Sequence, residues 1–190
     1  MEPKKEYILN IAQNIFARFG IKKTTMEEIA KMARMGKATL YYYFKSKEDI
    51  FAEVIRKESV VLKQKLLEAI NQVKTPKEKI TAYAITRMKQ LKELVNYYSA
   101  LTDEYLEHYS FVEKERENFT QFEMSTFKKI LSEGNNLGTF AIKNVPKTSR
   151  MLIIAMKGLE IPLLLEDKMV DIEKEIKFML NILFKGIEAR

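Results

Sequence analysis

Residues 24–44 of this 190-residue chain read TTMEEIAKMARMGKATLYYYF, a pattern that predicts two short helices joined by a tight turn. Thr25 and Glu28 have the spacing of a capping box, in which each side chain bonds to the backbone amide of the other residue, so the first helix should begin here. The turn falls at residues 34–36, and the second helix should occupy about residues 37–44. Helices of about eight residues are marginal on their own, and two of them joined by a three-residue turn are typical of a helix-turn-helix.

The flanking sequence predicts a helix on each side of this pair. Before it, apolar side chains recur along one helical face, at Ile8, Ala12, Ile15, Phe16 and Phe19. Gly20 is expected to end that helix as a left-handed cap. After the pair, Ser46 is expected to cap a fourth helix, with Asp49 at its third position.

Longer helices are predicted for the rest of the chain. Their expected bounds are about 46–72, 75–97, 110–134, 146–165 and 172–187, with a break near residues 97–99 and a loop over 134–138. Only six Gly and four Pro interrupt the sequence, and no alternating stretch rich in β-branched residues stands out. The predicted fold class is therefore all-α, with about nine helices.

The composition excludes several kinds of functional site. The absence of Cys rules out disulfides, cysteine-based zinc sites and thiol nucleophiles, and a single histidine rules out any site that needs two imidazoles. The sequence also lacks a phosphate-cradling glycine loop and a nucleophile elbow. We therefore expect a protein that is not an enzyme, with no catalytic residues, no metal and no cofactor.

Nothing in the sequence indicates a membrane protein. The N-terminus has no long apolar region typical of a signal peptide. The most apolar window, residues 151–165, is interrupted by Lys157 and Glu160 and is shorter than the roughly 20 residues that a span requires. We expect a soluble, cytoplasmic protein with no membrane partner.

Positive charge is concentrated near the N-terminus. Residues 1–50 carry ten Lys or Arg against six Asp or Glu, a net charge of +4, and residues 51–190 carry the remaining +3 of the total of +7. This excess favours a polyanionic partner at the N-terminal end. Charge alone, however, favours the alternative of a solvated surface that has no partner.

The second short helix, placed at 100° per residue, has a core face and a polar face. Leu40 and Phe44 lie on the core face, with Tyr43 beside them, and the opposite face of this helix has no acidic residue. Small and hydroxylated side chains can meet base edges, an ammonium can reach guanine or phosphate, and phenols can bind phosphate oxygens. The predicted DNA-binding residues are Thr25, Lys37, Ala38, Thr39, Tyr41, Tyr42 and Lys47. The alternatives are an aromatic core for the tyrosines, a solvated Lys47 and a purely capping Thr25.

The run from Ile8 to Phe51 resembles the DNA-binding region of transcriptional regulators of the TetR/AcrR family. Spacing and residue type agree at Ala12, Phe16, Gly20, Thr24, Thr25, Ile29, Ala30, Ala33 and residues 39–48, in a region of about a quarter of the chain. The family usually has Gly at the position of Arg34. A non-Gly residue in a left-handed conformation costs about 1–2 kcal/mol, so either the turn is remodelled or the strain is accepted. Arg34 is also a candidate phosphate contact.

The resemblance implies an N-terminal three-helix DNA-binding domain at residues 1–46 and a helical effector-binding and dimerisation domain at residues 47–190. It implies a sequence-specific regulator, most simply a homodimeric repressor released from a palindromic DNA operator by a small apolar or amphipathic effector. The alternative is a non-enzymatic helical-bundle protein that meets DNA or anionic surfaces without specificity. The repressor would have three partners: double-stranded DNA, a second copy of itself, and the effector.

Two regions of the body are candidate sites for these roles. The middle helices carry many large aromatic and Met side chains, which suit either an ordinary core or an effector pocket at Met88, Tyr98, Tyr105, His108, Phe122 and Phe127. The last two helices are apolar nearly all round, so a second copy is expected to cover them. The predicted dimer interface comprises Ile153, Met156, Leu164, Met179 and Leu183.

Overall fold

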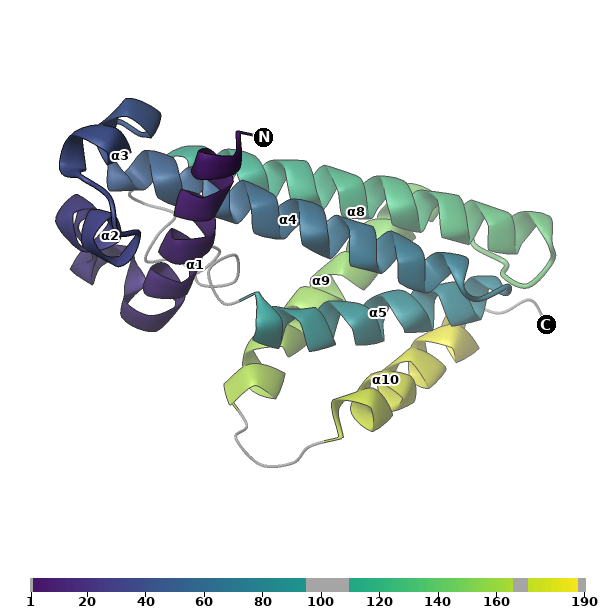
Figure 1. The fold of residues 1–190 in the computed structure, drawn as a ribbon. Coiled ribbons are helices and arrows are strands. Elements are labelled where there is room, and N and C mark those ends of the chain that lie inside the picture. The colour runs from purple at the N-terminus through teal and green to yellow at the C-terminus, as the bar shows by residue number, and fades with distance from the viewer. Residues whose placement is uncertain (1, 95–109, 166–170, 188–190) are drawn as a thin grey trace. The chain divides into compact units, whose positions relative to one another are not determined.

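Every regular element in the described part of the chain is a helix (Figure 1). The computed structural model describes residues 2–94, 110–165 and 171–187. The helices are α1 (Pro3–Lys23), α2 (Met26–Met32), α3 (Lys37–Tyr43), α4 (Lys47–Asn71), α5 (Pro76–Glu93), α8 (Ser110–Asn136), α9 (Val145–Leu165) and α10 (Ile172–Ile187). The all-α prediction is confirmed. The predicted break near residues 97–99, and with it the ninth helix, lies outside the described residues.

The chain divides into two compact units. The first comprises residues 1–61 and 94–116, and the second comprises residues 62–93 and 117–190. The first unit holds α1, α2 and α3, and the second holds α5, α9 and α10. The proposed domain boundary at residue 46 stays a prediction.

The core of the first unit forms where α2 packs against both α1 and α3 (Figure 1). The apolar face predicted for α1 is buried at Ile8, Ala12 and Phe16. The ring of Phe16 meets that of Phe51 of α4 edge to face, with ring centroids 5.2 Å apart. Because Leu40 of α3 is also buried, this core holds α3 by one face and leaves its other face exposed.

Gly20 interrupts α1 in a way that differs from the prediction. Its φ is positive, as expected, but at φ 75° and ψ 159° it does not adopt the left-handed helical conformation of a cap. This extended region of positive φ is open essentially to glycine alone. The first helical segment therefore ends at Gly20, as predicted, and a second short segment continues α1 to Lys23 beyond the kink. Only the predicted left-handed cap conformation is wrong.

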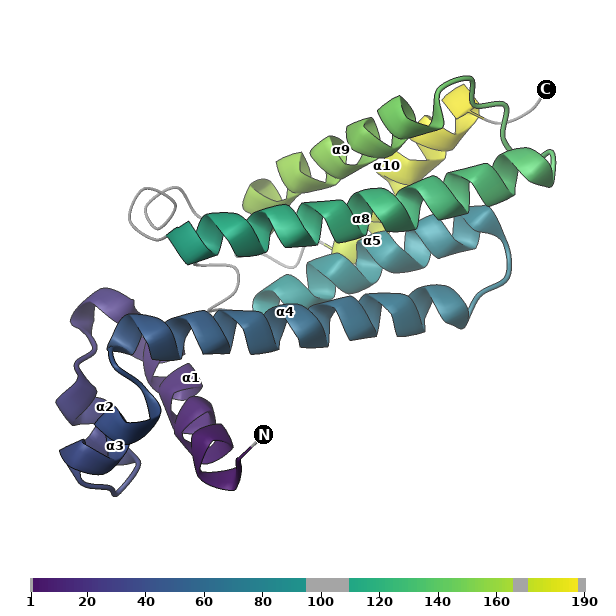
Figure 2. The ribbon, with the colours of Figure 1, turned by 90° about the horizontal axis from the view of Figure 1, so that it is seen from above.

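In the second unit, α10 packs against α5, and α5 packs against α9 (Figure 2). Both C-terminal helices begin with a side-chain cap, because Lys147 N donates to Asn144 Oδ1 at 3.0 Å and Lys174 N donates to Asp171 Oδ1 at 3.2 Å. These caps explain why α9 begins one residue before Pro146 and why α10 has its predicted bounds.

The predicted end of α8 at Gly134 is wrong, because the helix continues to Asn136. The positive φ that accompanies its end belongs to Gly138, at 68°. Gly134 serves packing instead: a Cβ at this position would lie 2.1 Å from Cδ2 of the buried Phe140. The amides of Thr139 and Phe140 both donate to the Gly134 carbonyl, at 2.8 and 3.1 Å, so the chain folds back over this glycine.

The most apolar helix, α9, packs within its own unit. Leu152, Ile153 and Met156 are buried, whereas Met151 and Ile154 are about half exposed. Within the described ranges, no helix has the length and hydropathy needed to cross a membrane.

Candidate nucleic-acid interface

The start of α2 is fixed by the predicted capping box. Thr25 Oγ1 accepts a hydrogen bond from Glu28 N at 3.2 Å, and Glu28 Oε2 accepts one from Thr25 N at 2.8 Å. The Thr25 hydroxyl also donates to Glu28 Oε2 at 2.9 Å. Thr25 is therefore a capping residue, and it remains exposed. Its phosphate contact stays a prediction.

The turn between α2 and α3 accepts backbone strain at Arg34. This is the one non-Gly residue with positive φ in the described ranges, at φ 52°. The turn is closed by Arg34 N, which donates to Lys31 O at 3.1 Å, and by Met35 N, which donates to Ala30 O at 3.0 Å. The turn is thus kept at a cost of about 1–2 kcal/mol, and the Arg34 side chain is exposed beside α3.

The helix α3 presents the face that the helical wheel predicts. Leu40 and Phe44 are buried, whereas Tyr42 is 81% exposed and Tyr41 is 48% exposed. Lys37, Ala38 and Thr39 are exposed as well. We call the exposed residues Lys37, Ala38, Thr39, Tyr41 and Tyr42 the reading face. An aromatic core is excluded for Tyr42, and the DNA contacts of this face stay predictions.

A carboxylate from α2 lies at this face, a feature that the sequence analysis missed. Glu27 forms an ion pair with Lys37, the first residue of α3. The hydrogen bond from Lys37 lowers the pKa of the Glu27 carboxyl, and the same bond raises the pKa of the Lys37 ammonium. Both groups therefore stay charged at neutral pH. The sequence does not indicate this ion pair, because ten positions and a turn separate Glu27 from Lys37.

Lys47 is held by the backbone of the first unit. Its Nζ donates to the carbonyl of Ile21 at 2.9 Å and to that of Thr24 at 3.0 Å. The interpretation of Lys47 as a solvated lysine is therefore wrong. Two of its three N–H groups are engaged in the connection between α1 and α2, and the predicted phosphate contact would use the remaining one.

Lys47→Ala is expected to destabilise the protein by about 1–2 kcal/mol, because the carbonyls of Ile21 and Thr24 lose a charged donor. If Lys47 also contacts phosphate, the variant will weaken all duplexes alike and reduce the salt slope by about one unit. Urea unfolding and DNA titrations at several salt concentrations measure the two effects. Lys45→Ala, at an exposed position nearby, is the control. Equal stability of the two variants would contradict the structural role.

In the second unit, a charged pair is buried between α5 and α8. Arg87 and Glu123 are 1% and 0% exposed, and Arg87 Nη1 lies 2.7 Å from Glu123 Oε1. The hydroxyl of the buried Tyr83 donates to the same oxygen at 3.1 Å. Burial, followed by the charge of Glu123, raises the pKa of Tyr83 well above its usual value, so the phenol stays protonated. Lys157 of α9 lies nearby, with Nζ 3.9 Å from Glu123 Oε2.

Three of the predicted effector residues belong to the helices that carry this pair: Met88 to α5, and Phe122 and Phe127 to α8. Met88 and Phe127 are buried, and Phe122 is partly buried. The ring of Phe127 meets that of Tyr83 edge to face, with centroids 4.7 Å apart. Tyr98, Tyr105 and His108 lie outside the described residues. The Arg87–Glu123 pair was not predicted from the sequence, although each of the two residues lies four positions from a core aromatic of its own helix.

The predicted dimer interface names some side chains of the last two helices that face the core instead of the surface. Ile153 and Met156 are 3% and 2% exposed in a single chain, so they are core residues and cannot offer surface to a second chain. Met179 and Leu183 are partly exposed, and the Leu164 side chain lies outside the described set. Among the described side chains of these helices, the large apolar ones that are exposed are Met151, Ile154, Phe178 and Ile182, which we call the C-terminal apolar face.

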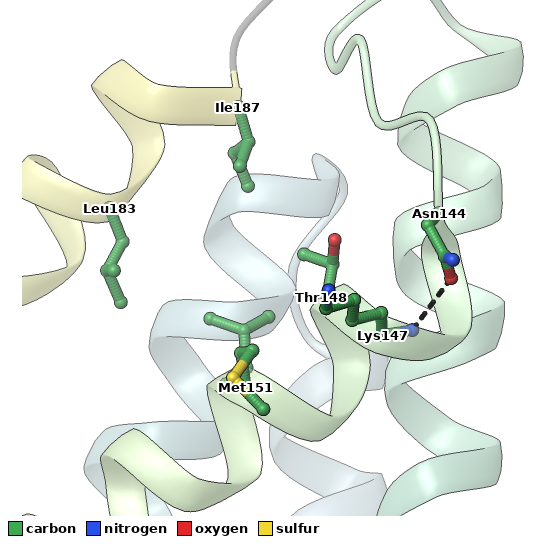
Figure 3. A pocket seen from close by; sticks show the side chains of 7 residues that line it. Asn144, Lys147, Thr148, Met151, Leu183 and Ile187 are labelled. Carbon is green, nitrogen blue, oxygen red and sulfur yellow. Dashed lines mark hydrogen bonds between the residues drawn. The ribbon is translucent and has the colours of Figure 1, made fainter.

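A groove of about 330 Å³ adjoins this face, between the start of α9 and the end of α10 (Figure 3). Met151 lines it from α9, and Leu183 and Ile187 line it from α10. Asn144 and Lys147, which form the cap at the start of α9, also line the groove. The groove extends the apolar surface around Leu183, the one predicted interface residue that lines it.

Comparison with known proteins decides the family. The model for bacterial regulatory proteins of the tetR family matches residues 8–54, and the model for the C-terminal region of QacR-like proteins matches residues 58–189. The chain belongs to the TetR family. It is therefore a DNA-binding transcriptional regulator, and the expectation drawn from residues 8–51 is confirmed.

Relatives of this TetR-family regulator extend over both units. The HTH-type transcriptional regulator QacR of Staphylococcus aureus is 29% identical over 161 residues, which cover 82% of this chain and 83% of QacR. A transcriptional regulator from Cytophaga hutchinsonii has a similar structure, with TM-score 0.77 and 28% identity over 97% of this chain and 98% of that one.

FadR from Bacillus subtilis, solved in complex with stearoyl-CoA, shares the fold with TM-score 0.77 and 21% identity, over 96% of this chain and 99% of that one. The named curated relatives are transcriptional regulators and not enzymes. Regulators of this family bind operator DNA and small molecules and act as dimers.

Proposed function

We propose that this regulator is a homodimeric repressor that binds a palindromic operator through the reading face and is released by a small apolar or amphipathic effector. The proposal of DNA binding rests on α3, which has one buried face and one exposed polar face. Its core face is buried at Leu40, and its opposite side exposes Ala38, Thr39 and the two tyrosines in the region matched by the TetR model.

The exposed groups of the reading face divide by chemistry. The methyl of Ala38 and the hydroxyl of Thr39 are small enough to let α3 approach base edges, where they supply sequence preference. The phenols of Tyr41 and Tyr42 suit phosphate oxygens, which position the protein without reading sequence. Thr25, Arg34 and Lys47 would add phosphate contacts around the helix-turn-helix.

The C-terminal apolar face supports a dimer. Phe178 and Ile182 are 64% and 57% exposed and lie one turn apart on α10, while Met151 and Ile154 lie one turn apart on α9. Large apolar side chains grouped on two neighbouring helices mark an interaction surface. A two-fold dimer would bury this face against its own copy and would match a palindromic operator.

Ile182→Glu is expected to weaken dimerisation at least about tenfold, because it places a charge where an apolar side chain would be buried. Sedimentation velocity over a concentration series measures the change. Asn181→Glu adds the same charge at a neighbouring exposed position and is the control. If both variants dimerise like the parent protein, the interface lies elsewhere.

An effector site is proposed in the second unit, around Met88, Phe122 and Phe127. Large apolar side chains with a few polar groups are the usual composition of ligand sites. Tyr83, Arg87 and Glu123 supply the polar groups beside these side chains. Effector binding would favour a second conformation of the dimer. In that conformation the distance between the two copies of α3 would no longer match the distance between the two halves of the palindromic operator.

An anisotropy titration tests the proposed function. Labelled duplex from the upstream region of the gene is titrated with protein in the presence of excess random DNA. Saturable binding at two protomers per site supports a sequence-specific dimer, and amphipathic compounds are then added to the complex to seek release. Binding that is lost to the competitor for every upstream duplex would favour the non-specific helical-bundle alternative.

A further inference from the structure

The ion pair between Glu27 and Lys37 connects the two helices of the helix-turn-helix at the edge of the reading face. Glu27 is the second residue of α2 and Lys37 the first of α3. Their side chains are 53% and 58% exposed, so the pair lies in solvent, where DNA can reach it. Neither residue contributes to the buried core of the first unit.

The pair places a negative charge where a polyanion is expected. The neighbouring Glu28 is engaged in the capping box through Thr25, whereas Glu27 binds the ammonium of a predicted DNA-contacting residue. A phosphate that recruits Lys37 must therefore compete with a carboxylate already in place. Like charges brought together at an interface disfavour partners that cannot compensate for them.

We propose that Glu27 is a specificity-determining residue, which holds Lys37 towards a base edge and opposes its capture by phosphates. This inference rests on the proposed DNA-binding function. On random DNA, binding depends on phosphate contacts, so Glu27 repels the backbone and withholds one cation. On the operator, Ala38 and Thr39 hold α3 in a fixed position, and Lys37, steadied by Glu27, can donate to guanine O6 or N7.

The test compares Glu27→Gln with the parent protein on operator and random duplexes. Gln keeps the size of Glu and its hydrogen-bonding capacity but removes the charge. Glu53→Gln is the matched control. Glu53 lies in the same unit, and its carboxylate also pairs with a cation, since Glu53 Oε1 lies 2.8 Å from Arg56 Nη1. Thermal unfolding confirms that each variant is folded. Titrations at several salt concentrations give the dissociation constant and the salt slope for each DNA.

We expect Glu27→Gln to bind random DNA about fivefold more tightly, the effect of one unit charge within a few ångströms in water. Its salt slope on random DNA should steepen by about one unit, because Lys37 becomes available to a phosphate. Operator affinity should not improve, so the ratio of operator to random affinity should fall about fivefold. Glu53→Gln should leave this ratio unchanged.

An unchanged ratio for Glu27→Gln, whether both affinities move together or neither moves, would overturn the proposal. The same substitution in a Lys37→Ala background tests the mechanism. There it should no longer lower the ratio, and an equal loss with and without Lys37 would show that Glu27 does not act through Lys37. Failure of the parent protein to prefer any upstream duplex over random DNA would instead reject the proposed function itself.

Discussion

Arg87→Met is expected to lower the free energy of unfolding by about 3–5 kcal/mol, because it leaves the buried carboxylate of Glu123 without its closest cation. Lys157, another cation, lies 3.9 Å from Glu123 Oε2 and is partly exposed, so it replaces Arg87 only in part. The Tyr83 hydroxyl donates one hydrogen bond to Glu123 but brings no compensating charge. Methionine fills much of the space of the arginine stem, so the loss reports mainly the unpaired charge.

Urea unfolding at neutral pH measures this loss, and Lys79→Met is the matched control. Lys79 also connects α5 to α8, since its Nζ lies 2.7 Å from Glu133 Oε1, but this pair is partly exposed. A pair of that kind contributes about 1 kcal/mol or less. Comparable losses in the two variants would show that burial does not set the strength of the Arg87–Glu123 pair.

Arg87→Met combined with Glu123→Leu should recover most of the stability, because a buried ion pair can be replaced by apolar side chains at little cost. The double variant should nevertheless alter the response to effectors, since Arg87 and Glu123 are next in sequence to the proposed effector residues Met88 and Phe122. A double variant as unstable as Arg87→Met would show that packing, and not the unpaired charge, causes the loss.

Thr39→Ala is expected to reduce discrimination between operator and random DNA by about 1–3 kcal/mol, while affinity for random DNA changes little. Thr39 is exposed beside the buried Leu40, so the substitution removes a hydroxyl and a methyl without opening the core. Alanine also favours the helix more than threonine does, so stability should not fall. The effect is therefore expected in sequence preference alone.

Competition titrations with operator and random duplexes measure the Thr39→Ala effect. Ser125→Ala removes a hydroxyl from an exposed position of α8 in the second unit and should leave both affinities unchanged. Equal losses on operator and random DNA would assign Thr39 to backbone positioning instead of base reading.

Features whose partners lie within four residues could be predicted from the sequence. The capping box of Thr25 and Glu28 is present as expected. The same motif starts α5, where Thr75 N donates to Glu78 Oε2 at 2.9 Å and Glu78 N donates to Thr75 Oγ1 at 3.3 Å. The exposure of Tyr42 opposite Leu40 follows equally from the 3.6-residue period. Local backbone hydrogen bonding and helical periodicity determine such features with little help from the rest of the chain.

Features whose partners lie far apart in the chain could not be predicted from local hydrogen bonding or helical periodicity. Lys47 was expected to meet solvent or phosphate, yet its ammonium bonds to the carbonyl of Ile21, 26 positions earlier. Near the C-terminus, α9 is apolar nearly all round, so its sequence does not indicate which of its side chains face the core. Ile153 was therefore assigned to the interface, although packing in the second unit buries it and exposes Ile154.

The residues alone thus determined the helical class, the helix-turn-helix and the polar side of α3, because propensity, capping and periodicity act over one or two turns. Only the tertiary structure decided that Glu27 meets Lys37, that Arg87 is buried against Glu123, and which apolar side chains stay exposed. These pairings depend on how the helices pack. The sequence contains many other charged and apolar side chains that could have paired with Glu27, Arg87 or the core at a similar free energy.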